Sequence, residues 1–310
     1  DDAGAAPGPD AVFPLGSTSK QFTAAAILAL ADAGQLRLDD PVGRYLPEWF
    51  AGEPQLRVAH LLWQTSGLAD FLWLDGYRAL GDEASTPMAA YVALGAAAPR
   101  RFGPGTRWAY SNTNYKALAL IAERVAGAPF DSVLAERVLR PLGLDGIVPC
   151  HDLAPEQLVP GVNVEGRPAP LDRSRAAYAG DGGLCGTAAA LQRWIRVGLA
   201  PRDGLGARLA VPAALADGTQ VPYGCGLSTR EFLGEAIVWH GGHVDGHTSE
   251  IADLPSRGLG LVSLTNRGYV WLTELMPALP DIPVPARGGP GGGRLARRLR
   301  AGLFPFPAPP

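Results

Sequence analysis

The sequence predicts an α+β fold in which helices fill the middle of the chain and an antiparallel sheet follows them. Up to about residue 199, stretches with apolar residues at helical spacing alternate with Gly- and Pro-rich turns. After residue 222 the pattern changes to short apolar or alternating runs punctuated by Gly, Asp and Pro, as in strands joined by tight turns. The sequence shows no internal repeat, so this order of elements favours an α+β layout.

The predicted helices end at recognisable stop signals. The first covers residues 17–34, with apolar side chains on one face and Gly34 at the position of a C-terminal cap. Another begins at Asn112, after the turn at residues 102–105, and ends at Gly127. Further helices are expected at residues 58–63, 87–95, 130–139, 187–199 and 271–279.

The remaining segments complete the predicted organisation. Strands are expected at residues 223–232, 235–239, 247–254 and 259–265. The stretch 148–178 is rich in Pro and Gly and is expected to be a surface excursion. We expect residues 1–279 to form one domain, with a helical lobe around residues 40–190. Residues 280–310, rich in Pro, Gly and Arg, are expected to form a C-terminal tail.

Composition excludes several classes of function. The 310 residues are enough to bury a large core. A net charge of -3 gives no electrostatic footprint for nucleic acid. No run of eighteen apolar residues is present, so no membrane span is predicted. Residues 1–10 lack the features of a signal peptide, which leaves either an intracellular protein or a mature chain that has already been cleaved.

The three cysteines, Cys150, Cys185 and Cys225, are widely spaced. They match neither a zinc pattern nor a dense disulfide framework. We therefore expect three buried or half-buried thiols, with one reactive thiol as the less favoured alternative.

The first candidate for chemistry is the pair Ser17 and Lys20. If Ser17 begins a helix, Lys20 lies on the same face, with the Cβ atoms roughly 5–6 Å apart. A serine hydroxyl becomes a good nucleophile only when a neighbouring base accepts its proton. A lysine serves as that base if burial or another cation lowers its pKa. Taken alone, the pair is explained just as well by helix capping.

The second candidate is Tyr110-Ser111-Asn112. Tyr110 can relay a proton if nearby cations hold it ionised, and the Asn112 amide can hydrogen bond to an acyl group. The simpler interpretation is that Ser111 or Asn112 caps the following helix.

The third candidate is His240-Gly241-Gly242-His243, at the end of an apolar strand. Two glycines let a substrate backbone lie close to the strand edge. The backbone N–H of His243 can then form an oxyanion hole with that of Ser17. A glycine-rich hairpin with a hydrogen-bonded histidine is the alternative.

Together the three motifs resemble the serine β-lactamase and penicillin-binding protein family, in particular the class C β-lactamase branch and its esterase and D-aminopeptidase relatives. The resemblance covers about residues 12–279 and implies one catalytic domain, with an antiparallel sheet flanked by helices plus an all-helical lobe. Further landmarks of the family lie at residues 15–23, 38–41, 60–68, 141–144, 182–184 and 264–266.

The resemblance also implies roles. Ser17 is the acylated nucleophile, Lys20 its proton acceptor or electrostatic support, and Tyr110 a general base that also activates the deacylating water or acceptor. Asn112 binds the substrate amide, and His240 lines the site. The implied substrate is a small ester, thioester or D-amino acid amide or peptide, with no cofactor. β-Lactamase or DD-carboxypeptidase activity is the alternative.

Two departures from the family pattern matter. His240 stands where the signature has a lysine, and a histidine of ordinary pKa, about 6.5, is mostly neutral at pH 7. This lowers the expectation of β-lactamase activity. Only sixteen residues precede Ser17, where the family places a helix and two strands. Either the chain is truncated, or its sheet is smaller, or another element fills the edge; an uncovered edge favours a homodimer.

Two rival functions are open to the sequence. His240, His243, Asp245 and His247 fall within eight residues and suggest a metal site, but the intervening glycines argue against the helix that a zinc-binding His pair usually needs. A non-catalytic binding protein on the same fold is weakened because the three motifs occur together. The aromatic residues Trp73, Tyr77 and Trp271 either line a pocket or pack in the core.

Overall fold

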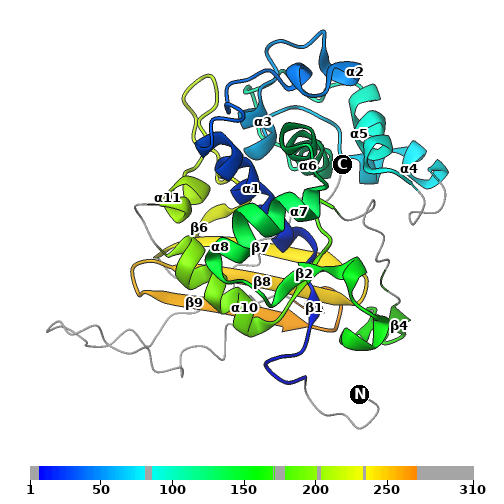
Figure 1. Ribbon diagram of the computed structural model, residues 1–310, viewed down its shortest axis with the longest axis vertical. Coiled ribbons are helices and arrows are strands. Elements are labelled where there is room, and N and C mark those ends of the chain that lie inside the picture. The colour runs from blue at the N-terminus through cyan, green and yellow to red at the C-terminus, as the bar shows by residue number, and fades with distance from the viewer. Residues whose placement is uncertain are drawn as a thin grey trace, which may run out of the picture.

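A four-stranded antiparallel sheet in the order β6-β7-β8-β9 underlies the molecule (Figure 1). The computed structural model describes residues 7–270, except 81–85, 170, 172–178, 201–203 and 233–234. The strands are β6 Ser228–Phe232, β7 Glu235–Val244, β8 His247–Leu254 and β9 Leu259–Thr265. All four predicted strands are present. β6 begins at Ser228, five residues after the predicted start at 223, and β7 continues through the His-Gly-Gly motif to Val244, past its predicted end at residue 239.

The helices form a lobe above the sheet and a layer across one of its faces (Figure 1). The longer ones are α1 Lys20–Asp32, α5 Met88–Ala97, α6 Asn112–Ala126 and α10 Ala188–Trp194. Shorter turns complete the lobe and the layer: η1 Gly16–Ser19, η2 Val42–Arg44, α2 Pro47–Phe50, α3 Val58–Leu62, η3 Phe71–Trp73, α4 Asp75–Ala79, α7 Phe130–Leu134, η4 Ala135–Leu139, α8 Arg140–Leu142, η5 Cys150–Asp152, η6 Pro155–Gln157, η7 Ile195–Leu199 and α11 Leu205–Ala210.

Helix ends follow the signals in the sequence. Helix α6 ends at Gly127, whose φ of 65° is the left-handed conformation that glycine adopts without a steric penalty. The segment predicted at 130–139 continues to Leu142 before Gly143, because Pro141 lies at the start of α8, where no backbone N–H is needed. The predicted helix at 271–279 and the tail at 280–310 lie outside the described residues.

Helix α1 forms the centre of the core. Most of its side chains are buried, and it packs against α6 and α7. Phe22 of α1 meets the ring of Trp194 at a centroid distance of 4.6 Å. Because α1 is surrounded, the residues at its N-terminal end are held in one place, which is what a catalytic group requires.

A second, three-stranded sheet fixes the position of η1, the turn that contains Ser17. Strands β1 Phe13–Pro14, β5 Leu184–Gly186 and β2 Ile147–Pro149 pair antiparallel in the order β1-β5-β2. Since β1 runs directly into η1 and β5 directly follows residues 181–183, their pairing places that loop beside Ser17. The prediction of a surface excursion over residues 148–178 is therefore partly wrong, because its first two residues belong to β2. It also contains the short pair β3 Gly161–Val162 and β4 Pro168–Ala169.

The expectation of three unpaired thiols is wrong. Cys150 and Cys185 form a disulfide, because the pairing of β2 with β5 brings their Cα atoms within 5.0 Å. The sequence separation of 35 gives no local signal of this contact. Cys225 is free and buried, and burial raises its pKa to about 12, which argues against a reactive thiol.

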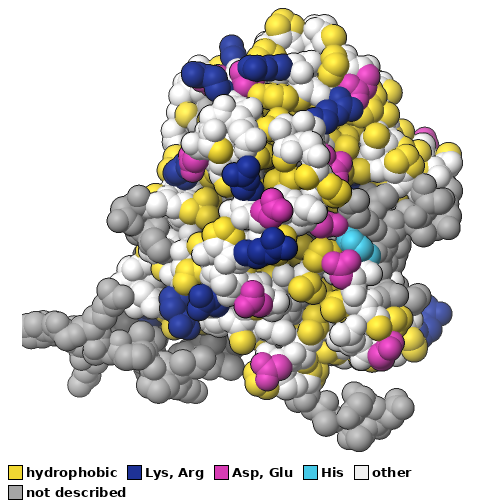
Figure 2. All heavy atoms as spheres, viewed as in Figure 1, with side chains coloured by type: hydrophobic (Ala, Val, Ile, Leu, Met, Phe, Trp, Pro, Cys, Tyr) yellow, Lys and Arg dark blue, Asp and Glu magenta, His cyan; other side chains and the backbone are white. Residues whose placement is uncertain are grey.

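The surface carries charged side chains of both signs (Figure 2). On the face shown in Figure 2, cationic and anionic side chains are interspersed without a patch of one sign. Within the described part of the chain, no helix has the length and apolarity that crossing a bilayer would require.

Candidate active site

Ser17 lies in the turn η1, directly ahead of helix α1, and Lys20 is the first residue of that helix. The Nζ atom of Lys20 lies 2.9 Å from Ser17 Oγ. The structure thus brings the pair together as their spacing predicts, with Lys20 fully buried. Neither residue makes a side-chain capping bond at the start of η1 or α1, so helix capping does not explain the pair.

Lys20 has a hydrogen-bond partner for each of its three donors. Besides Ser17, Nζ donates to Asn112 Oδ1 at 2.7 Å and to the main-chain oxygen of Asp181 at 2.6 Å. Burial lowers the pKa of Lys20 to about 8, against the opposing effect of the Asp181 and Asp70 carboxylates. About a tenth of Lys20 is therefore neutral at pH 7 and able to accept a proton.

Two carboxylates support this centre, and the sequence analysis missed both. Asp70 accepts a hydrogen bond from Asn112 Nδ2 at 2.9 Å and one from the backbone N–H of Leu72 at 3.2 Å. Burial raises the pKa of Asp70. Asp181 pairs with Lys116, with 2.7 Å between Nζ and Oδ1. Their positions in the sequence could have indicated a role, because Asp70 and Asp181 lie close to the family landmarks at residues 60–68 and 182–184.

Tyr110 lies against the Ser17–Lys20 pair. Its ring centroid is 5.0 Å from Lys20 Nζ, and its hydroxyl hydrogen bonds with Ser17. Burial raises the pKa of Tyr110 well above its ordinary value, more than the hydrogen bond with Ser17 lowers it. The phenol is therefore neutral at pH 7, whereas the sequence analysis required nearby cations to hold it ionised.

His240 is buried and does not line the pocket. Its Nε2 lies 3.1 Å from the hydroxyl of Tyr223, and its Nδ1 lies 2.7 Å from the main-chain oxygen of Gly241. The rings of Tyr110 and His240 are 6.4 Å apart between centroids. His240 thus contacts the site through aromatic neighbours, and Tyr223 is a further member that the sequence analysis missed.

The glycines of the third motif permit a close approach between β7 and η1. Strand β6 pairs with β7 only as far as Trp239, so beyond it one edge of β7 is left to face η1. A Cβ atom at Gly242 would lie 2.0 Å from the Leu15 oxygen, and one at Gly16 would lie 2.9 Å from the His243 nitrogen. Only glycine allows this packing, which brings the backbone of His243 beside Ser17.

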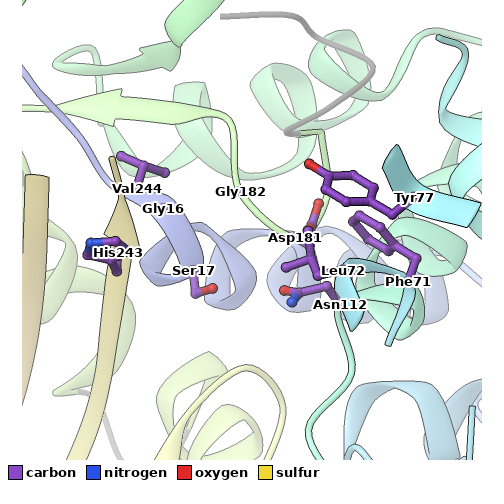
Figure 3. A pocket seen from close by; sticks show the side chains of 10 residues that line it. All are labelled: Gly16, Ser17, Phe71, Leu72, Tyr77, Asn112, Asp181, Gly182, His243 and Val244. Atoms are coloured by element: carbon purple, nitrogen blue, oxygen red, sulfur yellow. The ribbon is translucent and has the colours of Figure 1, made fainter. Parts of the chain in front are cut away.

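A pocket of about 120 Å³ opens beside Ser17 (Figure 3). Ser17 lies between a strand wall, with His243 and Val244, and a largely apolar wall on the other side (Figure 3). The pocket is lined by Gly16, Ser17, Phe71, Leu72, Tyr77, Asn112, Asp181, Gly182, His243 and Val244. Tyr77 therefore lines it, Trp73 does not and is 69% exposed, and Trp271 lies outside the described residues.

The histidine cluster does not assemble into a metal site. No three His, Cys, Asp or Glu side chains among the described residues are placed to hold an ion together. His240 is engaged with Tyr223, and His247 Nε2 lies 2.8 Å from the main-chain oxygen of Val159. His243 instead stacks on Tyr269, with ring centroids 4.0 Å apart.

The chain is similar in sequence to known D-aminopeptidases. D-aminopeptidases of Brucella anthropi and Brucella ovis are each 31% identical to the chain, over 242 and 249 residues. These matches cover 76% and 77% of the chain but 46% of each relative, so the chain spans about half the length of the curated relatives it matches.

Two solved structures share the fold at 25% identity. A D-stereospecific amidohydrolase from Streptomyces sp. superposes with a TM-score of 0.71 over 84% of either chain. An octameric penicillin-binding protein homologue from Pyrococcus abyssi gives 0.70 over 92% of this chain and 70% of its own. The Beta-lactamase family model matches residues 1–275. The chain therefore belongs to the beta-lactamase family and has the α+β fold of β-lactamases and transpeptidases.

Proposed function

We propose that the chain is a serine hydrolase that forms an acyl-enzyme at Ser17 and acts on small D-amino acid amides or peptides, with esters and thioesters as further substrates. The observation that carries the proposal is the contact of 2.9 Å between Ser17 Oγ and a buried Lys20 whose pKa lies near 8. The names of the relatives, D-aminopeptidase and D-stereospecific amidohydrolase, support the D-amide class.

Acylation begins with Lys20 in its neutral form. Nζ takes the proton of Ser17 Oγ while that oxygen attacks the substrate carbonyl carbon. Negative charge develops on the carbonyl oxygen and is stabilised by the backbone N–H groups of Ser17 and His243. One such donor is typically worth about 10²–10³ in rate. The close packing of Gly16 against His243 supports this pairing of donors.

Collapse of the tetrahedral intermediate requires a proton on the leaving nitrogen. Neutral Tyr110 donates its phenolic proton to that nitrogen and receives one from the Lys20 ammonium, which leaves both groups as they began. The C–N bond breaks, and the acyl group stays on Ser17. In deacylation a water attacks the ester, and its proton follows the same route through Tyr110 to Lys20 and finally to Ser17 Oγ.

The proposal is tested with a substrate panel on the full chain and its Ser17→Ala variant. The panel contains D- and L-amino acid p-nitroanilides, p-nitrophenyl esters, acyl thioesters and a chromogenic cephalosporin. We expect turnover of D-amides above their L-enantiomers, abolished in Ser17→Ala. Equal turnover of the two enantiomers would refute the D-amide class, and activity that survives Ser17→Ala would refute the mechanism.

The cephalosporin tests the alternative of β-lactamase or DD-carboxypeptidase activity. His240 is buried against Tyr223 and does not line the pocket, so it offers no permanent cation to a substrate carboxylate. We therefore expect slow cephalosporin hydrolysis relative to D-amides. A non-catalytic binding protein would instead bind these compounds without releasing product.

A homodimer also remains a proposal. The penicillin-binding protein homologue from Pyrococcus abyssi is octameric, which supports assembly of similar chains. Light scattering after size exclusion measures the mass directly. Twice the mass of 32.4 kDa is expected, and a monomer across the concentration range would contradict it.

A further inference from the structure

Lys116 is a second fully buried lysine near the site, and the mechanism above does not use it. It lies on α6 one turn beyond Asn112, so both side chains project from the same face of the helix. Its Nζ is 2.7 Å from Asp181 Oδ1 and 3.3 Å from the Ala179 oxygen. A buried ammonium is costly unless it is paired. Lys116 is paired with Asp181, and its Nζ also lies 5.6 and 5.2 Å from the ring centroids of Phe71 and Tyr91.

Asp181 connects Lys116 to the catalytic centre. Its carboxylate pairs with Lys116, while its main-chain oxygen accepts the 2.6 Å hydrogen bond from Lys20 Nζ. The backbone around it is intrinsically permissive, because Gly180 and Gly183 have φ values of 88° and 86°. Thr23 Oγ1 holds the preceding peptide by donating to the Gly180 oxygen at 2.7 Å. The ion pair with Lys116 is the contact that Asp181 makes through its own side chain.

We propose that Lys116 is a positioning residue: its ion pair with Asp181 holds the Asp181 carbonyl against Lys20, and so sets the place of Lys20 Nζ beside Ser17. The inference rests on the proposed function, since acylation of Ser17 is the step that it controls. A displacement of the base by about 1 Å can reduce a rate by roughly 10²-fold.

The charges that face Lys20 set its pKa, so the proposal can be tested through the pH dependence of acylation. Carboxylates of Asp181 and Asp70 raise the pKa of Lys20, the ammonium of Lys116 lowers it, and the rings of Tyr110 and Tyr115 lie 5.0 and 5.7 Å from Nζ. Removal of Lys116 deletes a cation that lowers the pKa of Lys20, and it leaves the Asp181 carboxylate without its ion-pair partner. Both changes raise the pKa of Lys20, so the rise of the acylation rate with pH moves to higher pH.

The experiment is a double-mutant cycle on the full chain. Lys116→Met, Asp181→Asn and the double variant are treated with a fluorophosphonate, and the rate of Ser17 phosphonylation is measured against pH. For Lys116→Met we expect roughly 10- to 100-fold slower labelling at neutral pH and a pH profile moved upward. Asp181→Asn should move the profile downward, and the double variant should lie between the two. Lys116→Arg keeps the charge and should recover part of the rate.

The control is Leu118→Met, a buried substitution on the same helix. An unmoved profile in Lys116→Met, or an equal effect in Leu118→Met, overturns the inference. If Lys116→Met does not fold, the test rests on the directions in which Asp181→Asn and the double variant move the pH profile of Ser17 labelling. Failure of the wild-type chain to be labelled at Ser17 overturns the proposed function instead, so the two failures are distinct.

Discussion

Lys20 and Asp70 are joined through the side-chain amide of Asn112. The amide oxygen accepts from Lys20 Nζ at 2.7 Å, and the amide nitrogen donates to Asp70 Oδ2 at 2.9 Å. Only this orientation of the amide satisfies both neighbours. One N–H of Asn112 is thereby committed to Asp70, and the second remains for the substrate amide expected from the sequence. Asn112 thus links the proposed base to Asp70 in one chain of hydrogen bonds.

The first prediction follows from that position. Asn112→Asp places another carboxylate beside Lys20, which raises the pKa of Lys20 and removes the N–H that faces Asp70. We expect acylation at neutral pH to slow by about 10²-fold, which corresponds to about 2.7 kcal/mol. Asn163→Asp is the matched control, because its side-chain oxygen accepts from the backbone N–H groups of Glu165 and Arg167 in an exposed turn. Wild-type acylation by Asn112→Asp would contradict the arrangement.

The second prediction concerns pH. Only neutral Lys20 accepts the Ser17 proton, and its pKa lies near 8. Acylation should therefore rise about tenfold per pH unit below 8 and level off above it. Single-turnover rates with a p-nitrophenyl ester provide the measurement. A plateau that already begins at pH 6 would show that another group takes the proton.

The third prediction separates the two proton carriers. Tyr110→Phe removes the phenol that protonates the leaving nitrogen, so D-amide turnover should fall by about 10²–10⁴-fold. A p-nitrophenolate leaving group needs no proton, and ester acylation should fall much less. Steady-state and burst kinetics on both substrates measure the difference. Equal losses of the acylation rate on the amide and on the ester would show that Tyr110 does not protonate the leaving nitrogen.

The fourth prediction concerns the disulfide. Cys150–Cys185 closes a loop across 35 positions, and a cross-link of this span stabilises the folded state by about 4 kcal/mol in the chain-entropy model. Cys150→Ala/Cys185→Ala should lower the Tm by on the order of 10 °C. Calorimetry with and without reductant measures it, and a reductant should not affect the double variant. An unchanged Tm would mean that the bond is absent or carries no stability.

Much of the fold could be predicted because its elements produce local sequence patterns. The helix that follows Ser17, the helix that ends at Gly127 and the four late strands each carry a periodicity or a stop signal. The sheet β1-β5-β2 could not be predicted, because strands of two or three residues have no period to read. The disulfide depends on that pairing and was missed with it.

The candidate site divides in the same way. Ser17, Lys20, Tyr110 and Asn112 stand in short motifs whose residue types suggest their chemistry. Asp70, Asp181 and Lys116 are single charges in a loop or on a helix face, and only the fold reveals that they meet. The neutral state of Tyr110 also depends on burial, which no sequence pattern records.

The most direct test is to locate the covalent adduct. The full chain is treated with a fluorophosphonate, digested, and analysed by mass spectrometry beside its Ser17→Ala variant. We expect one adduct, on the peptide that contains Ser17, and none in the variant. An adduct on another residue, or labelling that persists in Ser17→Ala, would contradict it.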